Sequence, residues 1–227
     1  MNIVLPGRFA AALCLAVASV ALAVQPGDAP KPAPAGEPTA PAAPRASGFK
    51  HEGTAENLKA LFKKLRELQD AKDHATASAL VQELMPTAER VRKHAFRPDV
   101  PKEKLDQVGR FYDTMPKPKD DQAWSAMIQG KAEMTEVLVI SGKTEDLAKG
   151  HPDMPGGVKR VAETLLKPGM SFFTVKYVKP GETIGMAYHL LFFDGAKWCM
   201  AGPLWRADRP APEPAAPGAP AESAPKK

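Results

Sequence analysis

Three strand-like stretches near the end of the chain, joined by two turn sequences, constrain the fold more than any other feature. They are MSFFTVKYV, TIGMAYHLLFF and KWCMAGPLWR, and together with the turns they fill residues 170–206. The turns are Lys179-Pro180-Gly181-Glu182 and Asp194-Gly195-Ala196. Pro, Gly and Asp favour tight turns, so the pattern predicts an antiparallel β-meander.

Alternation with a period of two assigns the two faces of this meander. If Val178 pairs with Thr183, one face is almost entirely apolar and should meet helices. That face holds Phe173, Val175, Tyr177, Ile184, Met186, Tyr188, Leu190 and Phe192. The opposite face holds Thr174, Lys176, Thr183 and His189, and because it also carries Phe172, Leu191, Phe193 and Trp198 we expect it to be partly covered.

Amphipathic helices are predicted upstream of the meander. Apolar residues at a spacing of three to four predict a helix over about 54–71, with Thr54 as its N-cap. A second helix begins near Ala75, and Pro86 ends it, kinks it or starts a new turn, because the apolar spacing resumes at Ala88. The remaining expected elements are helices over about 101–113 and 158–166, a strand over 133–141, a loop over 114–122, and one or two helical turns over 143–150 with Thr144 as cap.

Two proline-rich segments bound this region. Residues 24–47 hold seven prolines and residues 207–227 hold six, mixed with Ala and Gly. Such segments bury too little apolar surface to offset the entropy of ordering, so we predict disordered tethers. Residues 48–206 remain, a length typical of one domain, and their helices followed by a meander predict the α+β class.

Residues 1–23 have the pattern of a secretory signal peptide. Arg8 is the only charge, an apolar run spans 9–23, and Ala21-Leu22-Ala23 is a small-residue cleavage pattern. Leu13 before Cys14 argues against a lipoprotein site. The sequence predicts a periplasmic or secreted bacterial protein cleaved near Ala23, with no transmembrane segment after cleavage; the alternative is an uncleaved N-terminal anchor.

Cleavage would leave Cys199 as the single cysteine, without a disulfide partner. Its apolar neighbours indicate a buried hydrophobic residue and not a catalytic thiol. The whole chain has a net charge of +5 with both signs interspersed, and a nucleic-acid binder would instead gather its positive charge on one face. We therefore expect no nucleic-acid partner.

Linear motifs of the common enzyme classes are absent: there is no P-loop, dinucleotide fingerprint, HExxH, CxxC or Gly-Xaa-Ser-Xaa-Gly. No two of the five histidines lie three or four residues apart, which speaks against a metal site, and we expect no cofactor. His51, His74 and His151 are expected to be solvated. If the protein is an enzyme, the first candidates are His189, Tyr188 and Tyr177, although they do not share one strand face.

Two loops are weaker candidates for a site. Asp113, Asp120 and Asp121 flank a loop that ends at Trp124, and such a cluster can bind a sugar or a cation, or simply form the loop. The segment 151–157, HPDMPGG, is typical of a connector or a hinged lid. In both cases the structural interpretation is the simpler one.

The closing segment, Phe193-Asp194-Gly195-Ala196-Lys197-Trp198 followed by Gly202-Pro203-Leu204-Trp205-Arg206, resembles the last hairpin of NTF2-like proteins. The helix pair over 54–96 is also similar to the helices of that α+β cone. The resemblance implies a cone with a pocket. The helices at 101–113 and 158–166 depart from the compact family pattern, and no family acid or base can be carried over to this chain.

Our leading hypothesis is therefore an exported, non-catalytic α+β domain that binds a small ligand or a protein of the cell envelope. An NTF2-like enzyme of the dehydratase, isomerase or hydrolase type is the first alternative. A structural component of the envelope, held by its tails, is the second. A buried carboxylate beside His189 would favour the enzyme, and an apolar patch would favour a partner surface.

Overall fold

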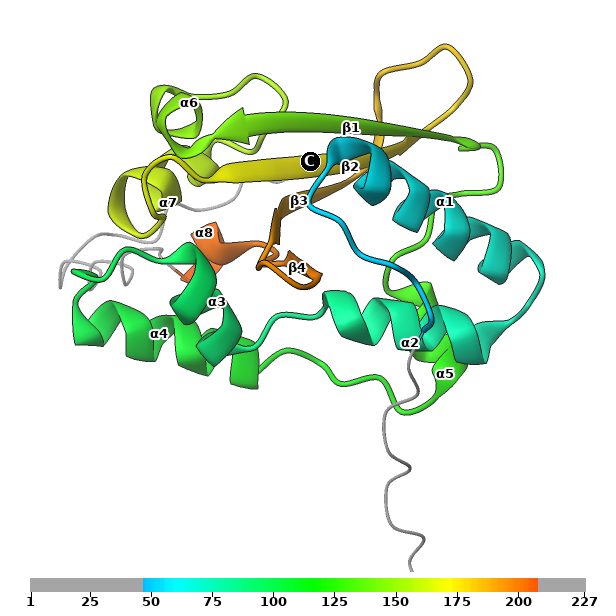
Figure 1. Ribbon diagram of the computed structural model, residues 1–227, viewed down its shortest axis with the longest axis horizontal. Coiled ribbons are helices and arrows are strands. Elements are labelled where there is room, and N and C mark those ends of the chain that lie inside the picture. The colour runs from blue at the N-terminus through cyan, green and yellow to red at the C-terminus, as the bar shows by residue number, and fades with distance from the viewer. Residues whose placement is uncertain (1–46, 208–227) are drawn as a thin grey trace, which may run out of the picture. The chain divides into compact units, whose positions relative to one another are not determined.

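The computed structural model describes residues 47–207, so the expected leader and almost all of both proline-rich segments lie outside the described residues. The described residues form a mixed α+β domain (Figure 1). Its helices are α1 (Ala55–Asp70), α2 (His74–Leu84), α3 (Ala88–Ala95), α4 (Lys102–Asp113), α5 (Asp121–Ala126), α6 (Thr144–Lys149), α7 (Gly157–Thr164) and α8 (Leu204–Ala207). Its strands are β1 (Glu136–Lys143), β2 (Ser171–Val178), β3 (Gly185–Phe193) and β4 (Trp198–Met200).

The expected helix pair at the start of the domain is confirmed. Thr54 caps α1, because its side chain accepts a hydrogen bond from the backbone N–H of Asn57. The apolar stripe of α1 is buried along its whole length. At Pro86 the chain does not kink but breaks: α2 ends at Leu84, and α3 is a separate helix capped by the side chain of Thr87.

The four strands form one antiparallel sheet in the order β1-β2-β3-β4, and the sheet is not closed. β1 pairs with β2 along its length, from Glu136 opposite Val178 to Lys143 opposite Ser171. β4 pairs with the end of β3, with Phe193 opposite Trp198. The sheet therefore contains the expected meander and adds β1 to one edge of it.

A β-bulge in β3 changes the expected faces of the meander. Val178 pairs with Gly185 and not with Thr183, and the register then shifts between Val175 and Phe173. Leu190 lies at the shift and has φ +57°, a left-handed conformation that is costly for leucine. One extra residue in β3 exchanges the faces of every residue that follows.

The predicted faces are therefore wrong on the far side of the bulge. Leu190 and Phe192 join the same buried cluster as Phe172, while Leu191 and Trp198 join the cluster of Phe173 and Tyr177. Ile184, which was expected to face the helices, is 83% exposed in the turn between β2 and β3. The sheet consequently presents apolar side chains on both faces.

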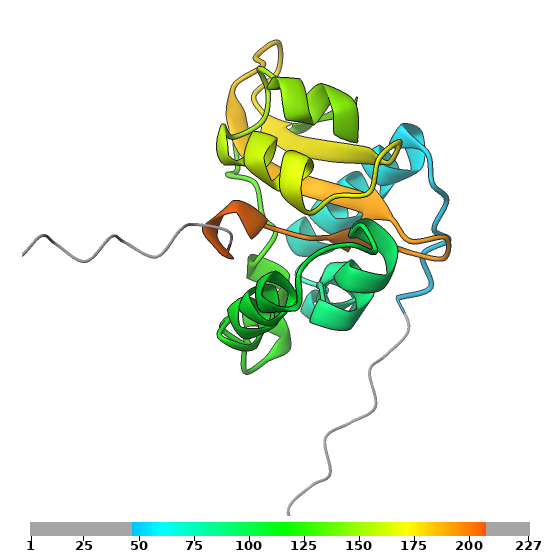
Figure 2. The ribbon, with the colours of Figure 1, turned by 90° about the vertical axis from the view of Figure 1, so that its left-hand side faces the viewer.

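Both faces of the sheet are covered by helices. The cluster that contains Trp198 is completed by α1 and α2, and the one that contains Phe192 by α3, α4, α6, α7 and α8. In Figure 1, α1, α2 and α5 occupy the right-hand side, and α3, α4, α6 and α7 the left-hand side. Figure 2 shows strands between α6 and α7 above and α3 and α4 below. The face that was expected to be only partly covered is packed against helices closely enough to form a second buried core.

Three smaller expectations are corrected. The last strand ends at Met200, and the following residues form α8, because Gly202 and Pro203 interrupt the strand. Part of the expected loop over 114–122 belongs to α5, which Asp120 caps through a hydrogen bond from the N–H of Ala123 (2.8 Å). Thr144 is the first residue of α6 and not its cap; its hydroxyl donates to the backbone oxygen of Lys167 (2.6 Å).

Candidate functional site

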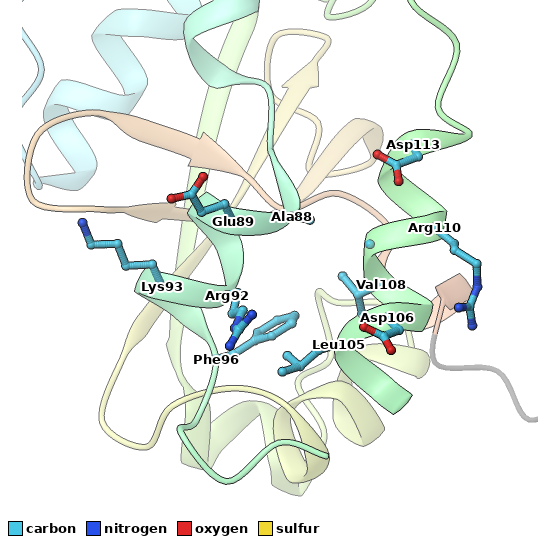
Figure 3. Close-up of a pocket in the computed structure, with 11 residues that line it drawn as sticks. Ala88, Glu89, Arg92, Lys93, Phe96, Leu105, Asp106, Val108, Arg110 and Asp113 are labelled. Carbon is cyan, nitrogen blue, oxygen red and sulfur yellow. The ribbon is translucent and has the colours of Figure 1, made fainter. Parts of the chain in front are cut away.

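An open groove lies between α3 and α4 and has a volume of about 720 Å³ (Figure 3). One wall is α3 and the other is α4, and the side chains of both helices border the space between them. It is lined by Ala88, Glu89, Arg92, Lys93, Phe96, Leu105, Asp106, Val108, Gly109, Arg110 and Asp113. The volume is within the range of about 300–1,000 Å³ that is typical of ligand sites.

Backbone contacts with a distant segment fix the end of the α3 wall. After α3, Phe96 forms an isolated antiparallel bridge with Leu166, which follows α7. The N–H of Arg97 donates to the oxygen of Leu165 (2.9 Å), and the N–H of Lys167 donates to the oxygen of Ala95 (2.8 Å). This bridge fixes the point from which the chain turns into α4, so the groove is built into the core.

The floor of the groove is apolar and its rims are charged. Phe96 and Val108 are only 2% and 3% exposed, and both belong to the buried cluster on this side of the sheet. The charged lining residues are Glu89, Arg92 and Lys93 on α3 and Asp106, Arg110 and Asp113 on α4, and Figure 3 shows Lys93 and Arg110 pointing to the outer sides of their helices. The rims therefore carry equal numbers of positive and negative side chains.

Several of these charges are available to a ligand. Among residues 47–207, neither Arg92, Lys93 nor Arg110 has an ion-pair partner within 4 Å. Asp106 does have one, because the ammonium of Lys102 lies 2.5 Å from its carboxylate and holds the pKa of Asp106 below its ordinary value. A bound partner can therefore satisfy the three cations without first breaking an existing ion pair.

A second hollow of about 430 Å³ extends the groove past the end of α3. It shares Arg92, Lys93, Phe96 and Leu105 with the groove and adds Arg97, Pro98 and Lys167. No carboxylate lines it. The ammonium of Lys167 is held in place by the backbone oxygen of Lys93 (2.7 Å). The extension therefore gives one end of the groove a cationic character.

The three candidate catalytic residues do not form a constellation. Tyr177 is fully buried and donates to the backbone oxygen of Phe62 (2.9 Å), and burial raises its pKa far above the ordinary value. Tyr188 lies on the same side of the sheet, with its ring 6.1 Å from that of Tyr177, and exchanges hydrogen bonds with the backbone of Gln129. His189 lies on the opposite face.

His189 has a hydroxyl and an indole beside it and not a carboxylate. Its Nδ1 lies 3.0 Å from the hydroxyl of Thr174, and its ring packs edge-on to Trp205 at 6.1 Å. Burial, with a smaller contribution from the charge of Lys176, lowers the pKa of His189 below its ordinary value of 6.5. Lys176 itself is paired with Asp153 (2.8 Å). This arrangement favours the neutral imidazole near pH 7, and the group that orients the ring is a hydroxyl and not a carboxylate.

The residues of the two candidate loops also lie apart from one another and do not form a common site. Asp120 caps α5, which agrees with the loop-forming interpretation, and Asp113 lies at the end of α4 on the rim of the groove. Within the connector, the N–H of Asp153 donates to Nδ1 of His151 (3.2 Å). Cys199 is buried, and burial raises its pKa to about 12, so the thiol is unreactive at neutral pH.

One polar network was not foreseen, because His51 was expected to be solvated. The side chain of His51 is only 4% exposed and donates from Nε2 to Glu83 (2.9 Å). Glu83 also accepts from the hydroxyl of Ser47 (2.9 Å) and pairs with Lys197 (3.1 Å). These hydrogen bonds outweigh burial and keep the pKa of Glu83 below its ordinary value. The network ties the start of the domain to α2 and to the turn before β4, a structural role.

Neither a metal centre nor a membrane span is found in the described part of the chain. Residues 47–207 contain no group of three His, Cys, Asp or Glu side chains placed to hold a metal ion. No helix within the same residues is long and apolar enough to cross a membrane. No protein-family model matches the chain, and no curated protein or solved structure is significantly similar to it.

Proposed function

We propose that this protein is an exported, non-catalytic binding domain, and that it holds a polypeptide segment of a cell-envelope protein in the groove between α3 and α4. The observation that carries the proposal is the combination of a buried apolar floor with exposed charges of both signs on its rims. Apolar side chains of a partner would displace water from the groove above its apolar floor, and its charged residues would pair with the rims.

A polypeptide suits this groove better than a small molecule. The charges stand on two separate helices along the length of the groove, so an extended or helical segment can reach both rims. The cationic extension beyond Phe96 would take an acidic residue at one end of the segment. The partner chemistry is thus a short segment with apolar residues in the middle, charges of both signs and an acidic end.

Two glycines offer a matched pair of variants for testing the groove. Gly109 lies on α4 at the groove, and Gly156 lies before α7 away from it; a Cβ built at either glycine meets nothing within 4 Å. Gly109→Trp should therefore fill the groove without disturbing the fold, and Gly156→Trp adds the same side chain elsewhere. The probe is a displayed library of random dodecapeptides selected against the full chain.

We expect the selected peptides to combine apolar and charged residues and to bind the wild type and Gly156→Trp about equally. Gly109→Trp should weaken their binding at least about tenfold, the loss of roughly one good apolar contact. Failure to enrich any peptide, or binding that is unaffected by Gly109→Trp, would refute the proposal. If Gly109→Trp lost the binding of small-molecule fragments but kept the binding of peptides, the groove would instead be a site for a small ligand.

The cone fold and the compartment are proposals of the same kind. An NTF2-like ancestry is supported by the order of a helix pair followed by antiparallel hairpins, but here Phe62, Tyr177 and Trp198 fill the space beneath α1. Export is supported by the leader pattern over 1–23. N-terminal sequencing of the chain recovered from an exporting host should give a start near Val24, and a start at Met1 would refute cleavage.

A further inference from the structure

The free edge of β1 is an unprotected sheet edge. β1 pairs only with β2, and no backbone group of residues 137–142 has a described hydrogen-bond partner on its other side. Figure 1 shows β1 at the margin of the sheet. Charges occur only at the ends of the strand, at Glu136 and Lys143, and the strand contains no proline. Sheet edges usually carry a lysine, a proline or a bulge that prevents pairing with another chain, and β1 has none of these along its middle.

A hollow of about 540 Å³ lies beside this edge. Leu138, Val139 and Ile140 of β1 line it and are half-buried. Glu56 and Lys59, one helical turn apart on α1, line the same hollow. Both are exposed, and neither has an ion-pair partner among residues 47–207. The edge is thus flanked by one free acid and one free base.

We propose that this edge pairs with the same edge of a second copy of the chain, which makes a two-fold symmetric dimer with a continuous sheet. A two-fold axis perpendicular to the sheet makes the two β1 strands antiparallel. With the axis at Val139, each Leu138 lies opposite Ile140 of the other copy, so apolar residues meet apolar residues and no like charges are opposed. The uncharged middle of the strand is complementary to itself.

The charges on α1 identify the occupant as a second copy. The same axis makes the two α1 helices antiparallel, and it brings Glu56 and Lys59 toward the other copy because these residues line the same hollow as Val139. Glu56 of each copy then lies beside Lys59 of the other, which forms the ion pair twice. A pair of strands alone buries less area than a stable interface usually needs, and a contact between the two α1 helices would enlarge it. An unrelated extended peptide would use the backbone of β1 but would not need this charge pair.

The test is the oligomeric state of the full chain, measured by sedimentation equilibrium over about a hundredfold range of concentration. We expect a monomer–dimer equilibrium. Ile140→Lys places a charge on the edge and should weaken the dimer at least about tenfold. Ile184→Lys is the matched control, because Ile184 is 83% exposed in a turn, and it should leave the dimer unchanged.

Charge reversal on α1 tests the symmetry without touching the core. Glu56→Lys alone places like charges together twice and should weaken the dimer about tenfold, and Glu56→Lys with Lys59→Glu should restore it. Far-ultraviolet circular dichroism confirms that each variant is folded. A wild type that stays monomeric, a dimer that survives Ile140→Lys, or a double reversal that fails to recover would each overturn the proposal.

Discussion

Replacing Trp198 by alanine tests the central claim about the sheet, which is that the bulge turns Trp198 into the core beneath α1. Trp198 is fully buried, and its ring packs edge-on against Phe173 at 5.1 Å and Phe193 at 5.5 Å. Its indole N–H donates to the side chain of Asn57 (3.0 Å), which ties β4 to α1. The substitution removes all of these contacts at once.

The expected loss in the free energy of unfolding is about 4 kcal/mol. Truncation of a buried tryptophan or phenylalanine to alanine typically costs about 3–5 kcal/mol, including the cavity that remains. The lost hydrogen bond adds little, because Asn57 is partly exposed and water can replace the indole. For a domain of this size, about 2–4 °C per kcal/mol gives a fall in Tm of about 8–16 °C.

The measurement is thermal or urea unfolding of the full chain, followed by circular dichroism, with Trp124→Ala as the control. Trp124 is half-buried on α5 and should cost less than half as much. A fall in Tm of less than about 3 °C for Trp198→Ala, or a fall no larger than that of Trp124→Ala, would refute the burial of this face.

Four further substitutions separate backbone, electrostatic and site effects. Gly109→Ala should stabilise the domain by about 0.5–1 kcal/mol in urea unfolding, because it adds a methyl group to an open helix position. Gly185→Ala should destabilise the domain strongly, because the new Cβ would lie 2.0 Å from a backbone oxygen of β2. Asp194→Asn should cost about 1–2 kcal/mol at pH 7 by weakening the 2.6 Å contact with Arg90. Burial raises the pKa of Asp194, but hydrogen bonds from two backbone N–H groups and Arg90 outweigh it and hold the pKa below its ordinary value of 3.8. The stabilisation is therefore present above that value and is lost below it, as the pH falls through the lower pKa of the folded state. The variant, which lacks this carboxyl group, should show a flatter acid limb. His189→Gln should leave Tm and peptide binding near wild type, and loss of function with normal folding would instead favour the enzyme hypothesis.

Local signals explain which parts of the fold could be predicted. The helix α1 has a side-chain cap at Thr54, a regular apolar stripe and no breaker, and all three are properties of consecutive residues. The separate start of α3 was one of the alternatives left open at Pro86, and Thr87 decides it by capping the new helix. Elements defined by their own residues were therefore placed within a few positions of their true bounds.

The faces of β3 could not be assigned from alternation, because the bulge is not a local property. Leu190 adopts a positive φ although leucine has no intrinsic preference for it, so packing from both sides must maintain it. One signal was present: the unbroken apolar run over 190–193 is typical of a strand that is buried on both faces. The groove was missed for a similar reason, since the approach of α3 and α4 depends on the bridge between Phe96 and Leu166.

If packing holds Leu190 in a strained conformation, the usual ranking of two substitutions should reverse there. In an ordinary strand, glycine is less stable than alanine by about 0.5–1 kcal/mol, because it loses more backbone entropy on folding. At φ +57° alanine keeps the steric cost of a Cβ, about 1–2 kcal/mol, and glycine does not. Both variants lose the fully buried leucine side chain, so that loss cancels in the comparison. Urea unfolding should therefore find Leu190→Gly more stable than Leu190→Ala by about 0.5–1 kcal/mol, whereas the opposite order would mean that β3 is regular and that Leu190 faces α1.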